Sequence, residues 1–196
     1  MKTLIIHPED RTTSFLKVIY ENIPDKTVVT GGVNKEKVRE LIASHDRVMM
    51  MGHGCPSGLF SMGRFFGTYG ALVIDASMVE ELQKKDNSVF IWCNADQFVN
   101  RYNLKGFYTG MFISEVMEAI YCGLPGTDQE DVDQSNFGFC EIAAKYINEE
   151  IETAYNSIRM EYSAIADENP VALYNYNRLY HRVSNFMVNH RNQFTV

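Results

Sequence analysis

The 196-residue sequence has no long uninterrupted run of apolar side chains and no excess of basic ones. Its apolar runs fall well short of the roughly 18 residues that a membrane-spanning helix needs. It has 18 Lys and Arg against 25 Asp and Glu, for a formal charge of −7. A nucleic-acid surface needs a basic face that neutralises phosphates. We therefore expect neither a membrane nor nucleic acid as the main partner.

The sequence also lacks a Cys-x-x-Cys motif. Its four cysteines are Cys55, Cys93, Cys122 and Cys140. The first residues, "MKTLIIHPEDRTT", have too short an apolar run for a secretion signal. We expect a cytoplasmic protein with free thiols, each of them a buried apolar side chain, a ligand or a nucleophile. No motif indicates a cofactor, and we expect none.

Short apolar runs alternate with helical patterns over the first two-thirds of the chain. We predict strands at residues 2–7, 26–32, 46–54, 88–93 and 105–113, and helices at 12–23, 34–45, 77–87 and 114–123. Asn34 is a residue type that suits the start of its helix, and the glycine-rich stretch 55–75 is typical of a hairpin or an irregular excursion. The alternation predicts an α/β fold with a mostly parallel sheet and helices on both faces.

The pattern changes after the acidic stretch 125–136, which we interpret as a loop. Residues 137–166 and 171–190 have the spacing of two long helices, separated by "DENP". We therefore divide the chain into an α/β domain, 1–124, and a C-terminal helical extension, 125–196, packed on the same domain. Aromatic side chains recur at helical spacing in the last predicted helix. They could pack on the α/β domain or on a second copy of the chain, so a homo-oligomer formed through the C-terminal helices is one possibility.

Polar and reactive residues follow the predicted strands at one edge of the sheet. "VMMMGHGCPSGLF" places His53 after the third strand, and "SVFIWCNAD" places Cys93 at the end of the fourth. In an open parallel sheet the functional crevice lies beyond the carboxyl ends of the strands. If these two strands are neighbours, about 4.8 Å apart, the imidazole and the thiol lie within contact or one-water range.

This pair has the components of acyl transfer. A thiol beside an imidazole can lose its proton and become a nucleophile, and the backbone N–H groups of Gly54 and Cys93 could hold the oxyanion of a tetrahedral intermediate. Each residue also has a structural interpretation. Cys93 could be a small apolar side chain that closes a buried strand, His53 could be bonded to the backbone at a tight turn, and Gly54 could serve the turn's φ angle.

An apolar strand ending in His-Gly, then a helix and a second apolar strand ending in Cys, resembles the caspase-like cysteine peptidases. This group includes caspases, gingipains, legumains, clostripain and separase. The likeness covers about residues 2–113, and the two reactive positions are 40 residues apart, similar to the roughly 50 of caspases. The resemblance implies a peptide or protein substrate, with His53 as general base and acid, Cys93 as nucleophile and Gly54 as an oxyanion donor.

Three further residues are candidates for substrate binding. Arg11 follows the first strand, where caspases have an arginine that binds an acidic substrate side chain. Trp92 stands where the family usually has Ala, Ser or Gly, and it could fill part of the substrate pocket. Asp96 could orient His53, extend a pocket for a basic side chain or cap the following segment. The preferred substrate side chain stays open between acidic and basic.

Other interpretations use the same residues. The chain could be a catalytically inactive binding module with the same fold, which would explain why the caspase string Gln-Ala-Cys-x-Gly is absent. The glycines of "TGGVN" and "GHG" could instead contact a nucleotide or a phosphate, although that signal is weak. His53, Cys55, Cys93 and Asp96 are ligand types that zinc accepts, but their spacing matches no recognised zinc site, so we expect no metal.

Overall fold

The computed structural model describes residues 1–68 and 72–183. Its main sheet has six strands in the order β2-β1-β3-β7-β8-β9. Their bounds are β1 Thr3–Ile6, β2 Lys26–Val29, β3 Arg47–Met51, β7 Ser88–Ile91, β8 Gly106–Thr109 and β9 Leu179–Arg182. Neighbouring strands are parallel from β2 through β8, and only β9 is antiparallel to its neighbour. The predicted mostly parallel sheet is confirmed.

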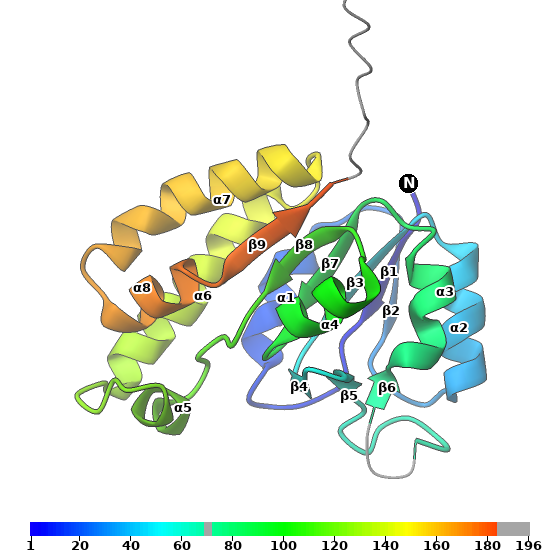
Figure 1. Ribbon diagram of the computed structural model, residues 1–196, viewed down its shortest axis with the longest axis horizontal. Coiled ribbons are helices and arrows are strands. Elements are labelled where there is room, and N and C mark those ends of the chain that lie inside the picture. The colour runs from blue at the N-terminus through cyan, green and yellow to red at the C-terminus, as the bar shows by residue number, and fades with distance from the viewer. Residues whose placement is uncertain (69–71, 184–196) are drawn as a thin grey trace, which may run out of the picture.

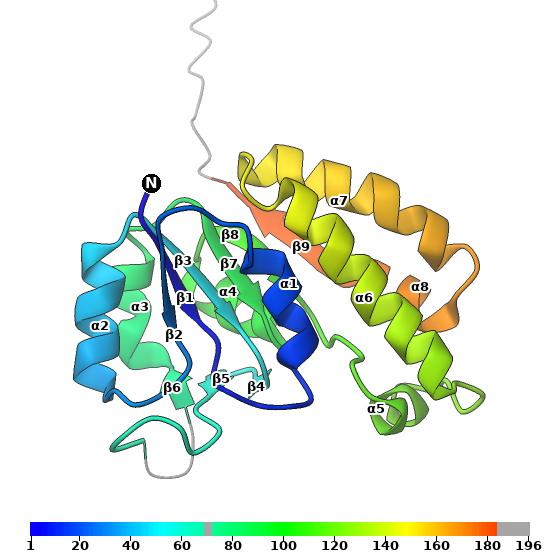
Figure 2. The same cartoon turned by 180° about the vertical axis from the view of Figure 1, so that it is seen from behind.

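Helices cover both faces of this sheet (Figures 1 and 2). On one face lie α1 Lys17–Tyr20, α6 Gln129–Tyr146 and α7 Ile151–Ala166; on the other lie α2 Lys35–Ser44, α3 Val79–Leu82 and α4 Ala95–Tyr102. The remaining helical elements are η1 Ser14–Leu16, η2 Ala76–Met78, α5 Val116–Tyr121 and α8 Pro170–Tyr176. The fold is therefore an α/β architecture of three layers.

The central strand β3 explains why the run "VMMM" is apolar at every position. Successive side chains of a strand point to opposite faces. Met49 and Met51 pack into the core beneath α6 and α7, whereas Val48 and Met50 pack into the core beneath α2 and α3. All four side chains are fully buried, as is typical of a parallel strand covered on both sides.

The C-terminal part differs from its prediction in three places. The single helix expected at 137–166 is two helices, because α6 ends at Tyr146 and α7 begins at Ile151. The expected loop 125–136 is wrong, because α6 begins at Gln129, where Asp128 accepts a hydrogen bond from the backbone N–H of Asp131. The expected helix 171–190 is also wrong, because α8 ends at Tyr176 and the chain continues as β9, which pairs with β8. Over four residues the alternation of a strand and the spacing of a helix are hard to distinguish. The backbone of Leu179–Arg182 forms a strand because it pairs with the open edge of β8. Residues after 183 lie outside the described part.

The predicted hairpin after His53 is present as a small antiparallel sheet. It consists of β4 Gly54–Cys55, β5 Gly58–Phe60 and β6 Leu72–Ile74. This sheet lies below the lower ends of the central strands in Figure 1. It therefore borders the edge of the main sheet at which β3 and β7 end.

Two buried polar side chains attach the C-terminal part of the chain to the part before it. Arg47 is fully buried, and its guanidinium donates hydrogen bonds to the carbonyls of Ile147 and Asn87 and to the side chain of Asn148. Asn175 of α8 bonds both the N–H and the carbonyl of Ile113 in the β8–α5 connection. No helix within the described ranges is long and apolar enough to cross a membrane.

Candidate functional site

The strands β3 and β7 are neighbours, so the condition for bringing His53 and Cys93 together is met, and Met51 lies opposite Ile91 in their parallel register. His53 and Cys93 each follow two residues later, so they leave the sheet at the same edge. Both side chains line a small pocket of about 20 Å³, together with Trp92 and residues of the connection after β1. The fold therefore brings His53, Cys93 and Trp92 to one place.

The imidazole of His53 is held from the connection after β1. Its Nε2 lies 2.6 Å from the hydroxyl oxygen of Thr12 and 3.6 Å from a carboxylate oxygen of Asp10. Because the Thr12 hydroxyl donates to Asp10, we assign the proton to Nε2 of His53, which then donates to Thr12. The other ring nitrogen, Nδ1, has no hydrogen-bond partner among the described residues. Its lone pair is therefore free to accept a proton.

Asp10 is an anion in this arrangement. The hydroxyl of Thr12 donates to it, and the backbone N–H of Thr12 adds a second hydrogen bond of 2.8 Å. These bonds, with the nearby His53, hold the pKa of Asp10 below its usual value. A carboxylate at this distance would stabilise a protonated imidazole. Asp10 and Thr12 follow the first strand in the sequence, but no local pattern connects them with His53.

Cys93 does not contact His53 through a hydrogen bond, although both are described residues of one pocket. Its Sγ lies 3.5 Å from the carbonyl oxygen of Phe112 and 3.9 Å from a carboxylate oxygen of Glu118. Burial, with the negative charge of Glu118, raises the pKa of the Cys93 thiol to about 12. At neutral pH the thiol is therefore protonated, and no thiolate–imidazolium pair is formed in advance.

Glu118 is a site residue that sequence analysis missed. Its second carboxylate oxygen accepts hydrogen bonds from the backbone N–H and the hydroxyl of Ser114, at 2.8 and 3.0 Å. These bonds hold the carboxylate beside Cys93, across the first turn of α5. The only signal in the sequence is a serine four residues before a glutamate at a helix start, which is too common to indicate a site.

Gly54 and Trp92 are linked by packing. The φ angle of Gly54 is not positive, unlike that of Gly52, whose φ is 136°. A Cβ atom at position 54 would instead lie 2.6 Å from Cγ of Trp92 and 2.7 Å from the carbonyl oxygen of Gly58. Trp92 itself is 2% exposed, and its indole N–H donates to the carbonyl of Cys55. Close approach, not the turn, therefore requires glycine here.

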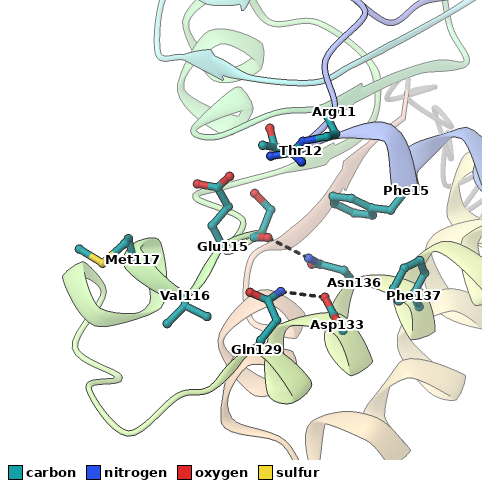
Figure 3. A pocket seen from close by; sticks show the side chains of 11 residues that line it. Arg11, Thr12, Phe15, Glu115, Val116, Met117, Gln129, Asp133, Asn136 and Phe137 are labelled. Atoms are coloured by element: carbon teal, nitrogen blue, oxygen red, sulfur yellow. Dashed lines mark hydrogen bonds between the residues drawn. The ribbon is translucent and has the colours of Figure 1, made fainter.

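Arg11 and Asp96 lie away from the small pocket. Arg11 lines a larger, open pocket of about 430 Å³, which Thr12 and Phe15 also line (Figure 3). Asp96 belongs to the first turn of α4 and lines neither pocket. One of its carboxylate oxygens is buried without a hydrogen bond to the described residues, and burial raises its pKa. Asp96 makes no hydrogen bond or ion pair with His53.

The described residues contain no group of three His, Cys, Asp or Glu side chains placed to hold a metal ion. Comparison with protein-family models and with curated proteins finds no match for this chain. The function must therefore be argued from the site itself.

Proposed function

We propose that this chain is a cysteine hydrolase that cleaves peptide or amide bonds, with Cys93 as the nucleophile and His53 as the general base. One observation carries the proposal. A histidine and a cysteine from neighbouring parallel strands line one pocket, and hydrogen bonding on Nε2 of the histidine leaves Nδ1 free. This arrangement is similar to that of the caspase-like cysteine peptidases, and it supports a peptide or protein substrate.

The reaction follows from the chemistry of these groups. As the Sγ of Cys93 attacks the substrate carbonyl carbon, its proton passes to Nδ1 of His53 and an S–C bond forms. The imidazolium is stabilised by Asp10 and then gives its proton to the leaving amine as the C–N bond breaks. Water, activated by the neutral imidazole, hydrolyses the thioester and restores the thiol.

The thiol of Cys93 could lose its proton either before or during the attack, and its raised pKa favours the second. A thiol with a pKa of about 12 is not a thiolate at neutral pH, so the proton has to leave during the attack. The backbone N–H of Cys93 donates no hydrogen bond to any described residue and is available for the oxyanion, with Gly54 as a second candidate donor. The free state of all four cysteines supports a reducing compartment such as the cytoplasm.

The test compares three variants on a library of blocked fluorogenic peptides that varies the residue before the scissile bond. We expect Cys93→Ala to abolish hydrolysis and His53→Ala to lower kcat/KM by about 10²- to 10⁴-fold. Cys55→Ala removes a neighbouring, half-exposed cysteine and should leave the rate unchanged. Thermal unfolding of each variant checks the fold. No hydrolysis of any peptide by the wild type, or hydrolysis that survives Cys93→Ala, would refute the proposal.

The second candidate is a catalytically inactive binding module, which is favoured by the protonated thiol and its contact with Glu118. Such a module would use the apolar side chains that the C-terminal helices expose, such as Met160 and Leu173, to bind a partner or a second copy. A peptide aldehyde separates the two candidates. A hydrolase should form a hemithioacetal at Cys93 that protects it from alkylation, whereas a binding module should not.

A further inference from the structure

The larger pocket, of about 430 Å³, lies between the connection after β1, the β8–α5 connection and α6 (Figure 3). It shares Phe15 and Ser114 with the small pocket of His53 and Cys93. A chain bound at Cys93 could therefore place a neighbouring side chain in the larger pocket. The charge and polarity of the residues that line this pocket determine which side chain it can bind.

One wall carries a buried hydrogen-bond acceptor without a partner. Asn136 of α6 is 4% exposed, and its Nδ2 donates to the carbonyl of Ser114 at 3.1 Å. Its Oδ1 is buried and has no hydrogen bond to the described residues. An unpaired buried amide oxygen is costly, and a donor brought by a ligand would satisfy it.

Two carboxylates line the same pocket. Asp133 lies one turn before Asn136 on α6 and accepts a hydrogen bond of 2.9 Å from Gln129, and Glu115 faces the pocket from the β8–α5 connection (Figure 3). Arg11 is the one basic lining residue. It stands beside Thr12, which contacts His53, and the Glu115 carboxylate points toward this side, whereas Asp133 and Asn136 form the opposite wall (Figure 3). The wall farthest from His53 is therefore acidic and accepts hydrogen bonds.

The rest of the lining is apolar. Phe15 is half-buried, and Phe137 and Met117 are 51% and 55% exposed. Aromatic faces attract cations, and the methylene groups of Lys and Arg pack on apolar surfaces while their charged ends remain in polar surroundings. The overall charge of −7 also attracts a cationic ligand over longer distances.

We propose that this pocket binds the Lys or Arg side chain of a polypeptide, with the methylene groups on Phe15 and Phe137, the cationic end at Asp133 and Asn136, and Glu115 attracting the charge from across the pocket. In the substrate this side chain belongs to a residue close to the scissile bond. Describing the polypeptide as a substrate rests on the function proposed above, whereas the binding itself does not.

The experiment measures binding to the full-length Cys93→Ala protein, so that cleavage cannot interfere. The probes are N-acetylated, C-amidated Ala-X-Ala peptides in which X is Lys, Arg, norleucine or Glu, and NMR titration gives each Kd. Norleucine has the length of Lys without the charge. We expect the Lys and Arg peptides to bind about tenfold more tightly than the norleucine peptide, from one exposed ion pair with Asp133 and the weaker attraction of Glu115.

Two variants test whether the carboxylates of this pocket cause the preference for Lys over norleucine. Asp133→Asn combined with Glu115→Gln, in the same background, should reduce the affinity for the Lys peptide to that for norleucine. Glu141→Gln is the matched control, because it removes one exposed carboxylate from the same helix about 12 Å further along and should change nothing. Equal binding of Lys and norleucine, tighter binding of the Glu peptide through Arg11, or an equal loss in the control overturns the proposal.

The two proposals fail in different ways. If the wild type hydrolyses no peptide but the Cys93→Ala protein prefers Lys and Arg peptides, only the proposed function fails. If the wild type hydrolyses peptides through Cys93 with no preference for Lys or Arg at any position, and the binding preference is also absent, only the assignment of this pocket fails.

Discussion

Replacing Glu118 by Gln should make Cys93 more acidic and more reactive. The carboxylate oxygen of Glu118 lies 3.9 Å from Sγ, and a unit charge at about 4 Å contributes about 1 kcal/mol in water and about 4 kcal/mol at a dielectric constant of about 20. Glu118 is partly exposed and already accepts two hydrogen bonds from Ser114, so we take about 1–2 kcal/mol. Each pKa unit corresponds to about 1.4 kcal/mol.

The pKa of Cys93 should therefore fall by about one unit, and its alkylation at pH 8 should become about tenfold faster. Burial is the larger cause of the raised pKa, so the thiol should still titrate above its ordinary range. The Gln side chain keeps the size of Glu and one oxygen that accepts from Ser114, which limits structural change.

The assay is alkylation with limiting iodoacetamide at pH 6–10, followed by mass mapping of each cysteine. Cys55, which has no contact with Glu118, is the internal reference. Glu115→Gln is the matched variant, because it removes an exposed carboxylate three residues earlier. An unchanged rate at Cys93 in Glu118→Gln, or an equal increase in Glu115→Gln, would refute the electrostatic role of Glu118 and leave burial alone as the cause.

Two further predictions concern stability. His7 is buried and its pKa is lowered to about 4 by burial, against about 6.5 in the unfolded chain. The contribution of neutral His7 to the free energy of unfolding is therefore complete above about pH 6.5 and is lost as the pH falls toward 4, by up to about 3 kcal/mol. Urea unfolding across this pH range should show the loss in the wild type but not in His7→Gln, and an equal loss in the variant would refute the assignment to His7. Arg47→Met leaves three acceptors unpaired and should lower the free energy of unfolding by about 3 kcal/mol. The melting temperature should then fall by about 6–12 °C. Arg101 is exposed, so the free energy of unfolding of the control variant Arg101→Met should lie within about 0.5 kcal/mol of that of the wild type.

Much of the fold was predictable because it depends on local patterns. The fully apolar run Val48–Met51 predicted a strand buried on both faces, and Asn34 marked the start of α2, where its side chain accepts from Lys37. The parallel direction of β3 and β7 followed from strand–helix–strand order, whereas their position side by side was only a condition until the structure showed it. These features need no knowledge of distant side chains.

The C-terminal part was less predictable because its structure depends on tertiary pairing. The four residues of β9 have no strong preference of their own, and the open edge of β8 makes them a strand. Similarly, the acidic residues around Asp128 suit either a loop or the first turn of a helix. The buried surface that α6 shares with the sheet favours the helix.

The candidate site was likewise predictable only in part. The sequence by itself determined that a histidine and a cysteine follow buried strands, and that such parallel strands end at one edge of the sheet. The pairing of these two strands as neighbours came from the structure. Only the tertiary structure decided which groups surround them. Asp10 and Thr12 contact His53, and Glu118 contacts Cys93, because loops and a helix far apart in the chain meet at that edge. The state of the thiol depends on those contacts and on burial, neither of which any local pattern encodes.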